Sequence, residues 1–254
     1  MKRHFLALAS CSFYMIVAAQ PSFQFKTLVH KKDTLPYRIL LPVSYDPAVK
    51  YPVIYFLHGS GERGTDNQAQ LVHGSKLFLD SANRRNFPAI VIFPQCPAKD
   101  AWPTMFKTNV LKRYFDYQLE PTNAMKMLLR LVKNIEKIYP TKKDQVYIGG
   151  LSMGGIGVFE IAARNPKLFA AAFPICGGGD TASAPRLKNI AWWVFHGSAD
   201  NVVLPEYSVK MVDALRKARA EVQFSLYPGV NHNSWDKAFA EPGLLPWLFS
   251  HAKK

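Results

Sequence analysis

The sequence has few cysteines and lacks the pattern of a metal-binding motif. Only three cysteines occur among its 254 residues. No cluster of cysteine and histidine has the spacing of a zinc site, and the seven histidines are scattered along the chain. The sequence therefore predicts no bound metal.

Internal repeats, low-complexity tracts and linkers rich in glycine, serine or proline are also absent. Hydrophobic residues make up 48% of the chain and charged residues 20%, which is typical of a globular protein. One α/β domain can reach this length. We therefore predict a single domain over residues 20–254.

Basic residues form no run longer than two, although the formal net charge is +14. Nucleic-acid-binding modules usually concentrate their basic residues on one element, so we predict no nucleic-acid partner. The charge fits a soluble basic surface, or attraction to anionic material outside the cytoplasm such as acidic polysaccharide.

The longest apolar run is too short to form a stable membrane span. It covers residues 5–19, about fifteen residues, whereas a spanning helix needs roughly twenty. Lys2 and Arg3 precede it, and small residues stand at Val17 and Ala19. This pattern predicts a signal peptide of residues 1–19, and hence a secreted or periplasmic protein.

A lipoprotein signal is the alternative for the same segment. Residues 8–11 resemble a lipobox that ends in Cys11, but the apolar stretch before Cys11 covers only residues 5–9. Lipidation of Cys11 is therefore the less favoured hypothesis.

Short apolar runs bounded by turn residues recur along the chain, at residues 52–57, 88–93, 145–148, 169–175, 190–195 and 222–226. Such runs are typical of strands buried on both faces of a parallel sheet. Residues 125–138 and 209–215 have helical periodicity. Alternating strands and helices predict a mostly parallel sheet with helices on both faces. Residues 23–28 and 37–41 predict antiparallel strands at its N-terminal edge.

The stretch "YIGGLSMGGIGVF" contains Gly150-x-Ser152-x-Gly154 between a predicted strand and a predicted helix. This spacing predicts a nucleophile elbow, the tight strand-to-helix turn that exposes a serine hydroxyl. The motif alone is a weak signal, and its position between the strand and the helix makes it stronger.

A serine nucleophile needs a base, and the base needs a carboxylate that orients it. In this architecture the chain order is serine, acid, histidine. Asp200 follows the strand in "WWVFHGSAD", and His232 follows the last strand in "YPGVNHNSW". We therefore predict a Ser152–His232–Asp200 catalytic triad. The weaker candidates for the acid are Asp180, Asp213 and Asp236.

An oxyanion hole requires two backbone N–H groups. One is expected from Met153, and the other from Ser60 in "LHGSGERG", with Gly61 as the alternative. His58 and His196 are expected to support their own loops rather than to act as bases. Glu62 and Arg63 are interpreted either as loop surface or as pairs that hold this loop rigid.

The motifs "FLHGSGERG", "PQCP", "YIGGLSMGG", "PICGGG", "FHGSAD" and "GVNHNSWD" occur in this order. Together, over about residues 35–250, they resemble α/β-hydrolase-fold carboxylesterases. The resemblance is to secreted bacterial esterases, often labelled predicted peptidases or phospholipase/carboxylesterase-like proteins, which are relatives of feruloyl esterases and polyhydroxybutyrate depolymerases. It implies the same triad, loop amides near Ser60 and Met153, and neither cofactor nor metal.

The strand order of this family also bears on Cys96 and Cys176. It implies two strands between those that end before these cysteines, and hence a separation of about 14 Å. A disulfide needs Cα atoms within about 7 Å of each other. We therefore expect two free thiols.

The resemblance favours a serine ester hydrolase acting on small esters, or on acyl and feruloyl-type esters attached to polysaccharide. A serine peptidase of the same fold is the alternative, although such peptidases usually carry an extra domain. A non-catalytic binding protein would require a broken triad or oxyanion hole. The sequence does not indicate the oligomeric state.

Two segments bear on the substrate pocket. Residues 177–189 are too short for a helical lid, so we predict no large cap domain. Residues 97–120 form a longer, aromatic-rich insertion that is either a small satellite core or a pocket wall. Trp102 within it is the candidate substrate-binding residue. Trp235 is expected to pack against the loop of His232.

Overall fold

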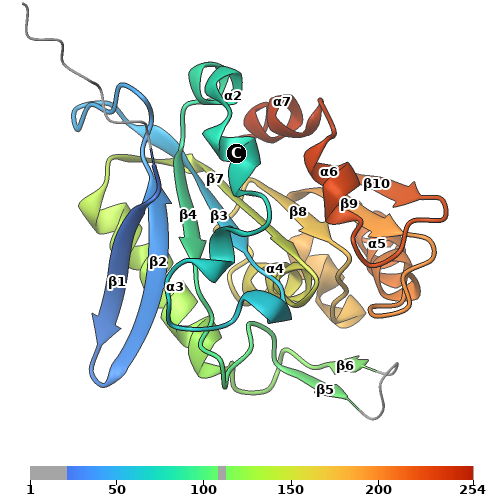
Figure 1. Cartoon of the computed structure of the whole chain (residues 1–254). Helices are drawn as coiled ribbons and strands as arrows, with labels where there is room; N and C mark the ends of the chain where they lie inside the picture. Colours follow the sequence, from blue (N-terminus) through green and yellow to red (C-terminus); the bar gives the residue numbers. More distant parts are fainter. Residues whose placement is uncertain (1–21, 108–112, 254) are drawn as a thin grey trace, which may run out of the picture.

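The chain centres on a sheet of eight strands in the order β1-β2-β4-β3-β7-β8-β9-β10 (Figure 1). The computed structural model describes residues 22–107 and 113–253, so the predicted signal peptide and Cys11 lie outside the described residues. β1 pairs antiparallel with β2, and β2 with β4, whereas the other pairs are parallel. The predicted sheet, with its antiparallel N-terminal edge, is confirmed. The strands are β1 Gln24–His30, β2 Asp33–Leu40, β3 Tyr51–Leu57, β4 Ile90–Pro94, β7 Thr141–Leu151, β8 Ala171–Ile175, β9 Ala191–Gly197 and β10 Val222–Tyr227.

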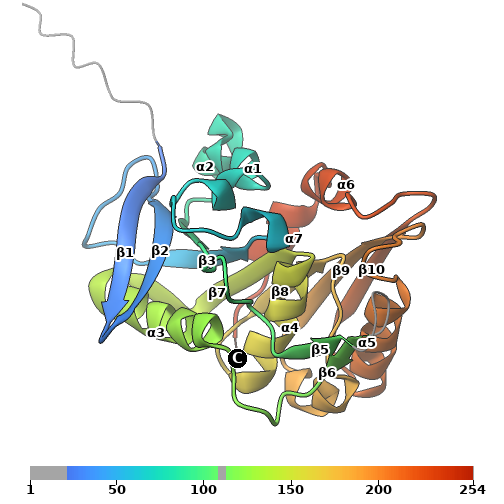
Figure 2. The same cartoon turned by 60° about the horizontal axis from the view of Figure 1, so that its bottom comes forward.

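Helices cover both faces of this sheet (Figure 2). One face carries α3 Asn123–Ile138, α4 Met153–Arg164 and α5 Glu206–Lys217. The other carries α1 Ser75–Leu79, α2 Ser81–Asn86, α6 Trp235–Phe239 and α7 Leu244–Phe249. No helix in the described ranges is long and apolar enough to cross a lipid bilayer.

The central strand β3 shows how the two faces form two cores. All of its residues are buried. Val53, Tyr55 and Leu57 belong to the cluster on the α3 side, while Ile54 and Phe56 belong to the cluster on the opposite side. Side chains alternate across a strand, so a continuous apolar run serves both clusters. Each fully buried side chain of this size contributes about 1.5–3 kcal/mol.

The first long helix, α3, has clear start and stop signals. The Thr122 hydroxyl accepts a hydrogen bond from the Met125 N–H at 3.0 Å, a cap that contributes about 1 kcal/mol. The helix ends before Tyr139, whose backbone is extended because Pro140 follows it. Ile138, the last residue of the predicted apolar stripe, is 58% exposed, so the buried stripe ends before it.

The insertion at residues 97–120 contains a two-stranded hairpin that the periodicity did not predict. It pairs β5 Met105–Lys107 with β6 Arg113–Phe115, and strands of three residues are too short for a clear alternating pattern. The hairpin lies beside α5 (Figure 2), where the rings of Phe115 and Tyr207 meet edge to face at 5.7 Å.

The segment between β8 and β9 holds only one 3-10 helix, Thr181–Leu187, which contains Pro185. It forms no helical lid, and the predicted absence of a large cap domain holds for the described residues.

Cys96 and Cys176 are both buried and free, as predicted. β3 and β7 separate the strands that precede them. Burial raises the pKa of both thiols.

Candidate active site

Ser152 occupies a strained turn between β7 and α4. Its φ is 52° and its ψ is −117°, a conformation that non-glycine residues rarely adopt. Two backbone hydrogen bonds hold the turn: the Ser152 N–H donates to the Ile175 carbonyl at 2.9 Å, and its carbonyl accepts from the Ile156 N–H at 3.0 Å. The serine therefore stands at the carboxyl edge of the sheet, at the start of a helix.

The glycine two residues after the serine makes this turn sterically feasible. A Cβ at Gly154 would lie 2.0 Å from the Leu57 carbonyl oxygen, inside any allowed contact distance. A Cβ at Gly150 would lie 2.7 Å from the backbone of Gly154. The two glycines of the Gly-x-Ser-x-Gly motif thus allow α4 to pack closely against β3 and β7.

The structure brings Ser152, His232 and Asp200 into one hydrogen-bonded chain. His232 Nε2 lies 2.9 Å from Ser152 Oγ, and His232 Nδ1 lies 2.7 Å from Asp200 Oδ2. Ser152 follows β7, Asp200 follows β9 and His232 follows β10, and the carboxyl ends of these parallel strands lie on the same edge of the sheet. This arrangement can take a proton from the serine hydroxyl and stabilise the resulting imidazolium.

The Asp200 carboxylate is buried and has four hydrogen-bond partners. Its Oδ1 accepts from the N–H groups of Val202 and Val203 at 2.9 and 3.0 Å. Its Oδ2 lies 3.2 Å from His196 Nε2 and 2.7 Å from His232 Nδ1. Burial by itself would raise the pKa of Asp200, but these hydrogen bonds outweigh it and hold the pKa below its ordinary value. Asp200 is therefore ionised and held in one orientation.

His196 supports the turn after β9, as the sequence suggested. Its ring is fully buried, and its Nε2 also lies 2.8 Å from the Val203 carbonyl oxygen. Its Nδ1 lies 2.7 Å from Ser208 Oγ on α5. These contacts tie the Asp200 loop to α5.

The other candidate acids have local structural roles. Asp180 caps the 3-10 helix after β8 by accepting from the Ala182 N–H at 2.9 Å. Asp213 lies on α5 and is exposed. Asp236 opens α6 and accepts from Asn233 Nδ2 at 3.1 Å. The structure brings none of the three into the chain of contacts around His232.

The loop after β3 places Ser60 beside the elbow. A Cβ at Gly59 would lie 3.6 Å from the Cβ of Ser152, so the two loops are in close approach. Ser60 begins the 3-10 helix Ser60–Glu62, and Met153 begins α4. The loop that carries Ser60 and the elbow that carries Ser152 and Met153 are therefore neighbours.

His58 holds this loop in place. Its Nδ1 donates to the Gly59 carbonyl at 2.6 Å, and its Nε2 accepts from the Cys96 N–H at 2.9 Å. Because Nε2 must accept, the ring is neutral. Burial lowers the pKa of His58 from 6.5 to about 4, although the bond to Gly59 partly offsets this effect.

This depressed pKa predicts a loss of stability in mild acid. Below pH 6.5 the unfolded chain binds a proton at His58 that the folded chain binds only near pH 4. Stability should therefore fall across this interval, by at most roughly 3 kcal/mol. Urea unfolding of the wild type and of His58→Gln between pH 7.5 and 4.5 measures the effect. The stability advantage of the wild type should shrink as the pH falls, and a constant advantage would contradict the prediction.

Arg63 bonds to its neighbours, in agreement with the second interpretation, whereas the Glu62 carboxylate lies beside two histidines at more than hydrogen-bond distance. The Glu62 carboxylate lies 3.9 Å from His58 and 3.7 Å from His73. Arg63 donates from Nε to the Ser60 carbonyl at 2.9 Å, and from Nη1 to the Asp100 carbonyl at 3.2 Å. These contacts brace the loop that carries Ser60.

Sequence reasoning missed His73. Its ring lies 5.1 Å from that of Trp235, which in turn meets the His232 ring edge to face at 5.4 Å. Trp235 therefore packs against His232 as expected. No local pattern marks His73, because its contact depends on the tertiary approach of the α1 and α6 regions.

Trp102 was predicted to bind the substrate, and this prediction is wrong. Its side chain is fully buried in the core on the α3 side, and its indole N–H donates to the His58 carbonyl at 3.2 Å. It also packs closely against the position of Gly157 on α4. In this structure Trp102 supports the loop of His58 and offers no surface to a substrate.

One group of side chains has the composition of a metal site. Ligand atoms of Cys176, Asp200 and His232 all lie within 4.8 Å of one another. However, burial raises the pKa of the Cys176 thiol, and a neutral thiol is a poor ligand. Asp200 and His232 are already bonded to each other. The group therefore fits a hydrogen-bond network better than a metal centre.

Activity should accordingly be insensitive to chelators. We expect an unchanged rate of ester hydrolysis after incubation with EDTA and removal of the chelate by gel filtration. A loss of activity that zinc or another divalent ion restores would overturn this prediction.

A nucleophile elbow at the carboxyl edge of a mostly parallel sheet, with helices on both faces, defines the α/β-hydrolase fold. The model of the Esterase family ("Putative esterase") matches residues 31–222. The chain belongs to this family.

Individual relatives agree with this assignment. The endo-1,4-beta-xylanase/feruloyl esterase of Xylanibacter ruminicola is 28% identical over an alignment of 203 residues that covers 76% of this chain and 26% of that protein. Lysophospholipase-like protein 1 of Mus musculus is 26% identical over 70% of this chain and 79% of its own. A crystal structure of a thermostable esterase superposes with a TM-score of 0.83 at 32% identity, covering 91% of this chain and 63% of that one. The chain thus spans only about a quarter of the first relative and less than two thirds of the third.

Proposed function

We propose that Ser152, His232 and Asp200 are the catalytic triad of a serine ester hydrolase. The observation that carries the proposal is the continuous chain of two short contacts, 2.9 Å from Ser152 Oγ to His232 Nε2 and 2.7 Å from His232 Nδ1 to Asp200 Oδ2. These are the distances that general-base activation of a serine requires.

In the first half of the reaction, Ser152 Oγ attacks the ester carbonyl carbon while its proton passes to His232 Nε2. The negative charge that develops on the carbonyl oxygen is stabilised by the N–H groups of Ser60 and Met153. The tetrahedral intermediate then collapses, His232 gives its proton to the leaving alcohol, and an acyl group remains on Ser152.

In the second half, water attacks the acyl-enzyme. His232 takes a proton from the water and returns it to Ser152 Oγ as the carboxylic acid leaves. Asp200 remains ionised and stabilises the imidazolium in both halves. The reaction requires no group beyond these residues and water.

For the substrate, we propose small esters and acyl or feruloyl-type esters attached to polysaccharide. The feruloyl esterase named among the relatives supports this class. The basic net charge, +14 for the full sequence and +12 without Lys2 and Arg3 of the proposed signal peptide, favours acidic polysaccharide. Purified protein should be assayed on p-nitrophenyl esters of graded chain length, methyl ferulate and acetylated xylan. A p-nitroanilide amide in the same panel tests the alternative, a serine peptidase, and faster cleavage of the amide than of every ester would favour it.

We also propose that the protein acts outside the cytoplasm. Lys2, Arg3 and the apolar run of residues 5–19 support a signal peptide cleaved after Ala19. Sequencing the N-terminus of the exported protein tests this proposal, and a modified Cys11 at the N-terminus would indicate a lipoprotein instead.

The enzyme should show no interfacial activation. A mobile lid over an apolar pocket is what makes lipases depend on an oil surface, and the segment between β8 and β9 holds only a short 3-10 helix. The rate on a short-chain ester should therefore saturate normally below the solubility limit of the substrate. A sharp increase in rate above that limit would show that another segment acts as a lid.

A further inference from the structure

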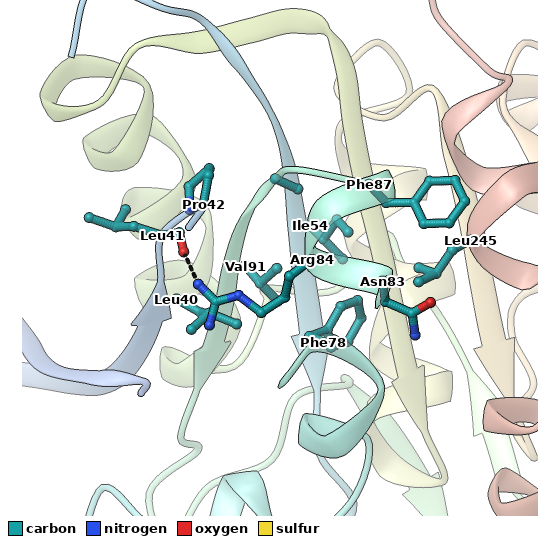
Figure 3. A pocket seen from close by; sticks show the side chains of 11 residues that line it. Leu40, Leu41, Pro42, Ile54, Phe78, Asn83, Arg84, Phe87, Val91 and Leu245 are labelled. Carbon is teal, nitrogen blue, oxygen red and sulfur yellow. Dashed lines mark hydrogen bonds between the residues drawn. The ribbon is translucent and has the colours of Figure 1, made fainter. Parts of the chain in front are cut away.

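A small pocket lies between α2 and the sheet (Figure 3). It is at the opposite end of the strands from Ser152. It lies beside Val91 near the start of β4, whereas Ser152 follows the end of β7, and both strands run parallel to β3. Its walls are mostly apolar and include Leu40, Ile54, Phe78, Val91 and Leu245. Its volume is about 20 Å³, roughly the space that one water-sized group occupies.

A buried cation faces this pocket. The Arg84 side chain enters from α2, and the residue is only 7% exposed. Its Nη2 donates to the Leu41 carbonyl at 2.8 Å. Its Nε and Nη1 are buried and have no hydrogen-bond acceptor, and no carboxylate lies within ion-pair distance among the described residues. A guanidinium stays charged in proteins, so these N–H groups require an anionic or strongly polar partner.

Arg38 shows how this fold normally accommodates a buried guanidinium. It is 8% exposed, and it donates to the carbonyls of Asn67 and Phe23 at 2.5 and 2.6 Å. Its charge also lies 3.2 Å above the ring of Phe25. Arg84 has one carbonyl and no such ring contact within the described part of the chain, so its charge is much less compensated than that of Arg38.

We infer that this pocket binds one small monovalent anion, of the size of formate or a halide, against Arg84. Free N–H groups at Nε and Nη1 supply charge-assisted hydrogen bonds. The small volume, the apolar walls and the two available donors favour a small, singly charged anion over larger or doubly charged ones. Arg84 already joins α2 to the end of β2 by its hydrogen bond to the Leu41 carbonyl, and the bound anion would hold the guanidinium in this position.

Thermal unfolding tests the inference, because an anion that binds only the folded state raises Tm. Formate is the probe, and gluconate at equal ionic strength carries the same carboxylate on a chain too large for the pocket. At about 100 times its dissociation constant, formate should raise the wild-type Tm by roughly 5–10 °C relative to gluconate. Arg84→Met should lose this difference.

Arg85→Met is the matched control, since Arg85 is the next residue on α2 and is exposed. It removes the same charge and should keep the full formate effect. If all three proteins respond equally, or if the wild type does not distinguish formate from gluconate, the inference is wrong.

A second measurement does not depend on the variants. Crystals of the wild type grown with sodium bromide should show an anomalous scattering peak within hydrogen-bond distance of Arg84 Nε or Nη1. Density for water alone at this position, without an anomalous peak, would mean that the pocket holds water and not an anion.

Discussion

Replacing Ser152 by alanine should lower kcat by about six orders of magnitude, because loss of the nucleophile removes the covalent pathway. Folding should be unaffected, since alanine keeps the Cβ and leaves the backbone contacts to Ile175 and Ile156 in place. The measurements are kcat on a p-nitrophenyl ester and the thermal unfolding curve. A fluorophosphonate probe should label the wild type at Ser152 and leave the variant unlabelled.

Ser60→Ala is the matched control for this experiment. Ser60 is a second serine beside the elbow, but its proposed contribution is its backbone N–H, which alanine retains. Its activity should stay within a few-fold of the wild type. Full activity in Ser152→Ala, or probe attachment at another residue, would reject Ser152 as the nucleophile.

Replacing Asp200 by asparagine should lower kcat by about 10⁴. The surroundings dictate how the new amide lies. The amide oxygen should take the Oδ1 position, which accepts from the N–H groups of Val202 and Val203, and the NH2 group should then face His232 Nδ1. That donor stabilises the tautomer with the proton on Nε2, which cannot accept the proton of Ser152.

Asparagine variants of the other candidate acids test whether Asp200 is the correct assignment. Asp180→Asn and Asp236→Asn should retain most activity, because these carboxylates bond to the Ala182 N–H and to Asn233. If either of them loses activity to the degree expected for Asp200→Asn while Asp200→Asn remains active, the acid is assigned incorrectly.

Local patterns were sufficient to predict most of the strands and the elbow. A continuous apolar run such as that of β3 must be buried on both faces, and Gly154 beside Ser152 is needed because any side chain there would meet the Leu57 carbonyl. These constraints act over a few residues, so they are visible in the sequence. The β5–β6 hairpin was missed because strands of three residues leave no period to detect.

The fold class, the strained turn at Ser152 and the chain order of serine, aspartate and histidine could all be predicted from the sequence, since each depends on local spacing and backbone sterics. The sequence favoured Asp200 as the partner of His232, and the tertiary structure shows what separates it from the other aspartates: Asp200 contacts His232, whereas Asp180 and Asp236 bond to the Ala182 N–H and to Asn233. The tertiary structure also decided that Trp102 is core rather than pocket wall. Arg84 looks like an ordinary surface residue of a short helix, and its burial arises only because α2 lies over the ends of β2 and β4 and beside α7. Burial and partners are set by segments distant in sequence, which no local pattern records.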